Sequence, residues 1–155
     1  METAICDTSS LSRLHKGNVL DCLGNIFHKV YIPKAVNEEC RNSRNPGIAN
    51  AVRKYFFETV SVNNILDIGL GKGEREAISL AKERNIKTIL LDDHKAIKTA
   101  IRLDLAPIGT SDILLIAKKM KLIPSVREVL DRMIQNGEGI DENYYIATLR
   151  EEDEI

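Results

Sequence analysis

The stretch Lys87-Thr88-Ile89-Leu90-Leu91-Asp92-Asp93 joins a nearly continuous apolar run to two adjacent carboxylates. A run of this kind is expected for a strand that is covered on both faces, as in a parallel sheet between helices. Helical spacing precedes it over Gly73–Arg84 and follows it over His94–Leu103. Strands that alternate with helices in this way predict crossover units and a parallel sheet.

The same alternation continues outward from this stretch. Further strands are predicted over Thr3–Cys6, Lys29–Ile32, Thr59–Val62 and Ala106–Ile108. Further helices are predicted over Ser9–Lys16, over Val19–Asn25 with Asn18 as its N-cap, from Pro33 to about Asn42, and over Ile48–Phe57 and Gly109–Met120. The expected fold class is therefore α/β, with three layers (α/β/α) around a central, mostly parallel five-stranded sheet.

The pattern changes after Pro124. Val126, Val129, Leu130 and Met133 form one helical stripe, and Asn143–Arg150 forms a shorter one. We therefore expect an α/β domain over residues 1–122, and a helical C-terminal appendage of the same domain over 123–155. The pairs Val19/Leu23 and Val129/Met133 are either internal core or a dimer seam, and core is the more conservative interpretation.

Composition narrows the class of protein. The net charge of −1 is not a general nucleic-acid signature, so contact with RNA would need a local basic patch. Cys6, Cys22 and Cys40 are odd in number and have no C-x-x-C spacing, which argues against disulfides and a zinc site and suits a reducing cytosol. There is no leader and no apolar stretch near the ~20 residues of a membrane span, so a cytoplasmic protein without a membrane partner is expected.

Acidic residues follow two of the predicted strands. Asp7 follows the first strand, and Asp92 and Asp93 follow the fourth. Ligands of open parallel sheets bind outside the carboxyl ends of the strands. Acids that converge there repel one another unless a divalent cation lies among them.

Two glutamates are predicted to face the same place. Glu74 shares a helical face with Ala77 and Ile78, while Glu76 lies about 200° around that helix and points elsewhere. Glu39 shares its face with Ala35 and Val36, whereas Glu38 turns toward Lys34 and Arg41. Carboxylates on apolar helix faces are costly without a partner, and a metal ion is the simplest partner they could share.

Each acid also has an ordinary explanation. Asp7, and Asp92 or Asp93, precede helices and suit N-caps. Glu74 suits the first turn of a helix through the macrodipole, and Glu39 could pair with a nearby lysine or arginine. It is the coincidence of strand-end aspartates with inward-facing glutamates that favours a metal site.

In these acids and their order the chain resembles the PIN-domain family. The matching segments are Cys6-Asp7-Thr8-Ser9, Pro33–Glu39, Gly73-Glu74-Arg75-Glu76-Ala77-Ile78, Leu90-Leu91-Asp92-Asp93 and Gly109-Thr110. The last three together resemble a subgroup of prokaryotic PIN-like proteins related to toxin nucleases. The order and spacing of the segments carry the resemblance, which extends over most of the chain.

The resemblance implies an endoribonuclease that depends on Mg²⁺ or Mn²⁺, often the toxin of a toxin–antitoxin pair. Its catalytic acids would be Asp7, Glu39, Glu74 and Asp93, with Asp92 as an additional metal ligand. RNA, an antitoxin protein and a second copy of the chain, in a homodimer, are the expected partners. The third acid of the family is often Asp, and here it is Glu74.

Two other functions stay open. A binding module for a protein or RNA would keep the fold without turnover, and the glutamate at position 74 is compatible with it. A phosphatase that uses Asp7 as nucleophile is disfavoured because its usual second Asp is replaced by Ser9. RNA could approach over the basic residues Lys95, Lys98 and Arg102, or over Lys118, Lys119 and Lys121, although such stripes are equally typical of solvated helix faces.

Overall fold

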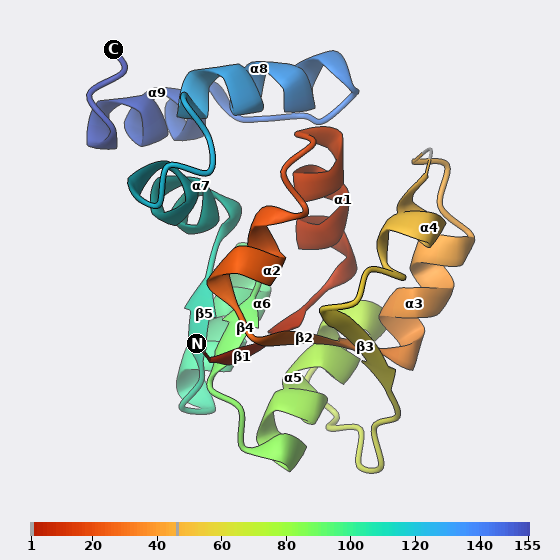
Figure 1. Cartoon of the computed structure of the whole chain (residues 1–155). Helices are drawn as coiled ribbons and strands as arrows, with labels where there is room; N and C mark the ends of the chain where they lie inside the picture. Colours follow the sequence, from red (N-terminus) through yellow and green to blue (C-terminus); the bar gives the residue numbers. More distant parts are fainter. Residues whose placement is uncertain (1, 46) are drawn as a thin grey trace.

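The centre of the molecule is a five-stranded parallel sheet. The computed structural model describes residues 2–45 and 47–155. Its strands are β1 (Thr3–Cys6), β2 (Lys29–Pro33), β3 (Phe57–Val60), β4 (Thr88–Leu90) and β5 (Ala106–Ile108), in the order β3-β2-β1-β4-β5 (Figure 1). Every neighbouring pair is parallel. The predicted parallel sheet is confirmed.

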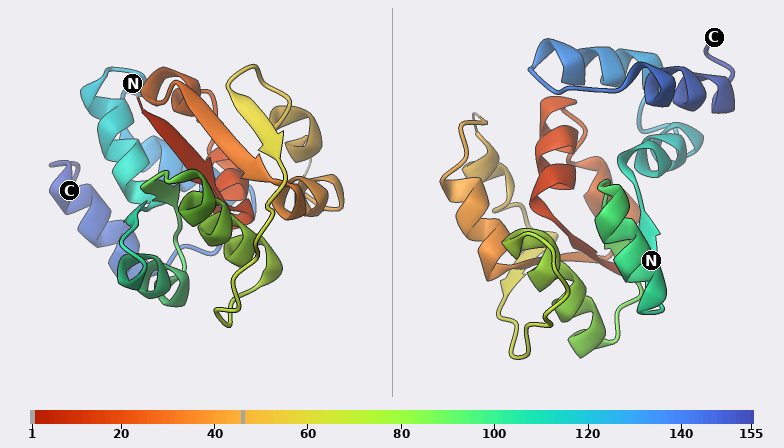
Figure 2. Two further views of the ribbon diagram at one scale, coloured as in Figure 1. Left: turned by 90° about the horizontal axis from the view of Figure 1, so that it is seen from below. Right: turned by 180° about the vertical axis from the view of Figure 1, so that it is seen from behind.

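Helices cover both faces of this sheet. They are α1 (Thr8–Lys16), α2 (Cys22–Ile26), α3 (Lys34–Arg41), α4 (Ile48–Ala51), α5 (Lys72–Arg84), α6 (His94–Arg102), α7 (Thr110–Lys119), α8 (Val126–Gln135) and α9 (Glu142–Glu151). Strand alternation divides the core, because Ala4 and Cys6 join a cluster with α1, α2 and α7 while Ile5 joins one with α5 and α6. Figure 2 shows the sheet between these helices. The three-layer α/β/α arrangement is therefore confirmed.

The strand order places a switch point beside β1. The chain moves from β1 to β2 and β3 on one side, then crosses to β4 and β5 on the other. Cys6 is level with Leu90 in the sheet, so Asp7 and Asp92 leave their strands at nearly the same height. This reversal is where open parallel sheets form ligand crevices.

Two predicted helices are wrong in extent. Asn18 does not cap a second helix: it has a φ of 57°, and the amide of the next residue, Val19, donates to Leu14 O. Asn18 thus ends α1 in the left-handed conformation that asparagine tolerates, and α2 begins only at Cys22.

The predicted helix Ile48–Phe57 stops at Ala51, and the following strand begins at Phe57 instead of Thr59. Tertiary packing explains the difference. Phe56 lies so close to Gly24 that an added Cβ there would be 2.4 Å from the ring, and Phe57 pairs with Val30 in the sheet. Aromatic residues suit such pleated, buried positions.

The C-terminal helices form a layer on one end of the domain. α8 packs against α1 and α7, and α9 packs against α8 (Figure 1). Val129 and Met133 are buried, and an added Cβ at Gly17 would lie 2.8 Å from Met133 Cε. Val19 and Leu23 are buried as well, so both apolar pairs belong to the core and neither is a dimer seam.

Within the described part of the chain, none of the helices combines the length and the apolar character needed to span a bilayer.

Candidate active site

A pocket of about 140 Å³ opens where β1 ends and α5 begins. It is lined by Asp7, Thr8, Ser9, Glu39, Gly71, Lys72, Gly73 and Glu74. Three of the acids predicted from sequence therefore share one pocket, although they come from α3, α5 and the end of β1. Asp92 and Asp93 follow β4 and are not part of this lining.

Asp7 uses only one of its two carboxylate oxygens. Its Oδ1 accepts a hydrogen bond from the amide of Ser10 at 3.0 Å, which caps α1. Its Oδ2 is buried and receives no hydrogen bond from residues 2–45 or 47–155, and the same holds for Thr8 Oγ1 in the same pocket. The N-cap explanation of Asp7 thus accounts for one oxygen and leaves the other one for a ligand.

The environment of Asp7 disfavours its charged form. Burial raises the pKa of Asp7 to about 7, against the lowering effect of the Ser10 hydrogen bonds. The negative charges of Asp92 and Glu74 contribute to the same rise. A carboxyl group in this condition gains more from a nearby cation than an exposed one does.

Glu74 stands in the first turn of α5, above the buried Ala77 and Ile78 as predicted. It is half-buried. Burial and the charge of Asp93 raise its pKa, and Glu39 adds to this effect while Lys95 opposes it. Glu74 is therefore the acid that is electrostatically coupled to both Asp93 and Glu39.

Glu39 reaches the pocket from the surface. Ala35 and Val36 of α3 are buried as predicted, and Glu39 on the same helical face lines the pocket, although its side chain is exposed and not buried. Its long side chain brings Oε1 to 2.6 Å from the position of an added Cβ on Gly73. The missing side chain at Gly73 is thus what lets Glu39 approach the start of α5.

The neighbouring glutamates stay outside the pocket. Glu76 is buried but does not line it, in agreement with its predicted direction. Glu38 is exposed and lies 3.8 Å from Lys72 Nζ. Helical spacing therefore sorted the glutamates of α3 and α5 correctly, although it did not give their exposure.

Asp92 and Asp93 have different environments. Asp92 accepts hydrogen bonds from Thr110 N at 2.8 Å and Thr110 Oγ1 at 2.5 Å, and from Ser10 Oγ at 3.4 Å. The guanidinium of Arg13 lies 3.7 Å from the same carboxylate. Asp93 is exposed and caps α6 by accepting from the amide of Ala96. The carboxylate of Asp92 is thus held by residues of α1 and α7, whereas the negative charge of Asp93 raises the pKa of Glu74.

Asp92 has three partners that the sequence does not indicate, namely Ser10, Arg13 and Thr110. Gly109-Thr110 belongs to the family resemblance, but the resemblance gives Thr110 no role. Arg13 also donates to Glu138 at 2.8 Å, and thereby connects the site to the loop between α8 and α9. These contacts cross the chain at long range, so no local pattern announces them.

The donors can be compared with the needs of a metal ion. Among residues 2–45 and 47–155, no group of three or more His, Cys, Asp or Glu side chains is arranged so that it could hold one. Mg²⁺, however, keeps several waters and needs only one or two carboxylates from a protein. The unpaired buried Asp7 Oδ2, with Thr8 Oγ1 beside it, suits that kind of partly hydrated ion.

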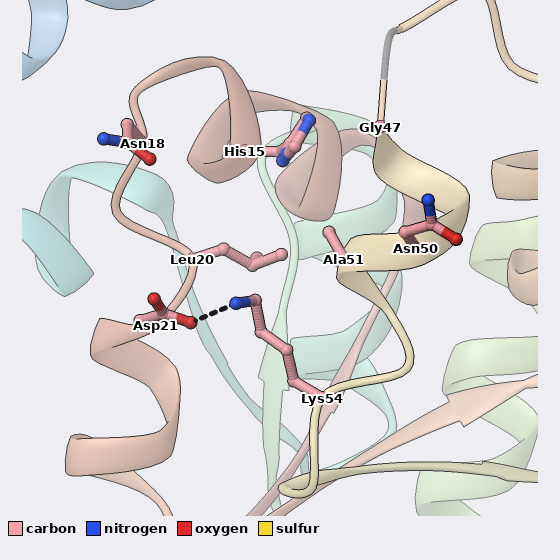
Figure 3. A pocket seen from close by; sticks show the side chains of 8 residues that line it. All are labelled: His15, Asn18, Leu20, Asp21, Gly47, Asn50, Ala51 and Lys54. Atoms are coloured by element: carbon pink, nitrogen blue, oxygen red, sulfur yellow. Dashed lines mark ion pairs between the residues drawn. The ribbon is translucent and has the colours of Figure 1, made fainter.

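A second pocket of about 300 Å³ lies between α1 and α4, and Figure 3 shows its lining. Across it, Lys54 Nζ forms an ion pair with Asp21 Oδ1 at 2.7 Å. None of the five acids predicted from sequence lines it. The smaller acidic pocket is therefore the better candidate, despite its size.

A family model described as a PIN domain matches residues 3–154 of the chain. Among curated proteins and among solved structures, no significant match is found.

Proposed function

Because the chain belongs to the PIN-domain family, whose members are generally nucleases, we propose that it is a metal-dependent endoribonuclease that hydrolyses RNA phosphodiesters. The observation that carries this proposal is the buried, unpaired Oδ2 of Asp7 beside Glu39 and Glu74. A carboxylate oxygen in this position is costly unless it meets a cation.

In this proposal Mg²⁺ or Mn²⁺ would be held at Asp7 and would keep several of its waters, and Glu39, Glu74 and Asp93 would add negative charge around it. When bound, such an ion polarises the phosphodiester and lowers the pKa of the water that attacks phosphorus. Asp7 is fixed for this role because its other oxygen caps α1. The partners of Asp92 are already within the protein, so we assign it to positioning the ends of α1 and α7.

The test is cleavage of RNA by the full chain with Mn²⁺ or Mg²⁺, against EDTA. Asp7→Asn keeps the cap oxygen but removes the charge. We expect it to lower the cleavage rate about 100-fold or more, because a metal ion contributes several kcal/mol to such a reaction. Asp67→Asn, an exposed residue outside the pocket, is the matched control. Equal cleavage by Asp7→Asn and wild type removes Asp7 from the mechanism.

A binding module without turnover is the second candidate. It is favoured by the finding that the acids of the described ranges form no ready group of three metal ligands. The two functions separate when Mn²⁺ titration is combined with the cleavage assay. Binding of Mn²⁺ without hydrolysis of any RNA supports the module, and cleavage that EDTA abolishes supports the nuclease.

We also propose a cellular role, partners and a compartment for the protein. A toxin role, with an antitoxin protein and a second copy of the chain as partners, follows from the resemblance noted in the sequence. The cytoplasm is the proposed compartment, which the three free, buried cysteines suit. Co-expression with the product of the neighbouring gene, followed by light scattering, tests both partners.

A further inference from the structure

The exposed face of α6 carries three cations beside an exposed apolar side chain. Lys95, Lys98 and Arg102 are all exposed and are spaced at i, i+3 and i+7, so they share one side of the helix. Ile101 is 58% exposed next to them. These four residues alone line a shallow hollow of about 450 Å³. Large apolar side chains with this exposure are uncommon in the rest of the molecule.

The three cations are free to bind an external anion. In the part of the chain that the structure describes, no carboxylate forms a salt bridge with any of them, and Arg102 donates only to Thr99 Oγ1. In contrast, Lys54 and Lys118 are held in ion pairs with acidic partners at 2.7 and 2.8 Å. A cation without a carboxylate in direct contact remains available to a phosphate.

The face follows β4, which pairs in the sheet with β1, the strand that ends at the pocket residue Asp7. α6 starts immediately after Asp93, and the positive charge of Lys95 acts on Glu74 strongly enough to oppose the rise of its pKa. From Lys95 to Arg102 the helix advances about 10 Å, at 1.5 Å per residue. The cations therefore lead away from the pocket along a line that is one side chain wide.

We propose that this face of α6 binds the backbone of single-stranded RNA beside the acidic pocket, with Ile101 against a base or ribose. Phosphates would lie on Lys95, Lys98 and Arg102, and the narrow line of charge suits one strand better than the two strands of a duplex. The binding of RNA to this face does not depend on the proposed nuclease activity. Only the identity of the bound segment rests on that function, because it would be the segment next to the phosphate that is cleaved.

The test is the binding of a fluorescein-labelled oligouridylate to the full chain in EDTA, measured by anisotropy over a range of salt concentrations. The variant Lys95→Gln/Lys98→Gln/Arg102→Gln removes all three charges. We expect it to weaken binding about 10-fold or more at low salt, and to reduce the slope of log K against log[salt] by about 2, at about 0.7 per phosphate contact. Ile101→Ala should weaken binding without changing the slope.

Arg44→Gln/Arg53→Gln/Arg150→Gln is the matched control, because it removes the same net charge from exposed residues outside α6 and outside the Lys118–Lys121 cluster. The control should bind like wild type. The proposal is overturned if the α6 variant, with an unchanged circular dichroism spectrum, keeps the wild-type slope, if the control loses as much affinity, or if a duplex of the same length binds as tightly.

The outcome is separable from that of the nuclease proposal. Absence of cleavage in the presence of Mn²⁺, together with the expected change of slope, leaves the α6 surface standing and removes the nuclease. Cleavage of RNA by the α6 variant with an unchanged KM overturns the surface and leaves the nuclease standing.

Discussion

At the scale of single residues, Asp7 and Asp92 follow adjacent strands but differ in how many of their carboxylate oxygens have hydrogen-bond donors. Asp92 is surrounded by donors from Thr110, Ser10 and Arg13. Asp7 has Ser10 on one oxygen and no hydrogen-bond donor, among the described residues, on the other. A satisfied carboxylate stabilises its surroundings, whereas an unsatisfied buried one is available to a ligand. This contrast, more than the number of acids, is the reason for placing the proposed metal site at Asp7.

The raised pKa of Asp7 has a consequence for stability. Its pKa of about 7 in the folded state lies above the ordinary 3.8, so the folded state binds more protons between these values. The contribution of Asp7 to the free energy of unfolding is therefore fully present below about pH 4 and is lost as the pH rises through 7. In EDTA, we expect Asp7→Asn to raise the free energy of unfolding at pH 8 by on the order of 2 kcal/mol relative to its effect near pH 4. Urea denaturation measures this, and no gain at pH 8 would contradict the burial of an unpaired charge.

Gly73 provides the space into which Glu39 reaches. In Gly73→Ala the new Cβ would lie 2.6 Å from Glu39 Oε1. Glu39 is exposed, so it can move away, and the higher helix propensity of alanine offsets up to about 1 kcal/mol of the cost to stability. We expect the affinity for Mn²⁺ to fall about 10-fold, as a calorimetric titration would measure. Gly139→Ala, with open space around it, is the control. Unchanged affinity in Gly73→Ala would exclude Glu39 from the site.

At the scale of elements, helix ends connect the site to the rest of the fold. Asp7 caps α1, Asp93 caps α6, and Asp92 holds the start of α7. At the other end of the molecule, Glu154 accepts from the amides of Val126 and Arg127 at the start of α8. The last residues of the chain thus close the N-terminus of a helix that begins 28 positions earlier.

This contact at α8 should depend on pH. Burial acts to raise the pKa of Glu154, but hydrogen bonds from Lys118, Ser125 and two backbone amides hold it down at about 2. A depressed pKa means stability that is present above the ordinary 4.5 and is lost as the pH falls through 2. We expect Glu154→Gln to lower the free energy of unfolding by about 1 kcal/mol at pH 7, because solvent screens part of the ion pair with Lys118, and to have little effect near pH 2.

Thermal or urea unfolding measures the effect of Glu154→Gln. Glu151→Gln, an exposed residue of α9 with the same change of charge, is the control. An equal loss at both pH values, or an equal loss in the control, would contradict a charged cap on α8.

At the scale of the whole molecule, the sheet and the presence of Asp7, Glu39 and Glu74 in one pocket could be predicted from local periodicity, whereas Asp92 and Asp93 lie outside that lining. The strand Ala106–Ile108 and the inward face of Glu74 were predicted from spacing alone. Spacing did not predict the features that depend on contacts between residues far apart in the sequence. The packing of Phe56 on Gly24 ends α4 early, and Thr110, 18 positions away, fixes Asp92. The exposure of Glu39 likewise depends on where α5 lies.

The most direct test of the account is calorimetric titration of Mn²⁺ into the metal-free protein, into Asp7→Asn and into Asp67→Asn. If a cation relieves the unpaired charge of Asp7, wild type and Asp67→Asn should bind Mn²⁺ alike, and Asp7→Asn should bind about 10-fold more weakly or worse, a loss of about 1.4 kcal/mol or more. Binding of equal strength by Asp7→Asn would contradict the central claim.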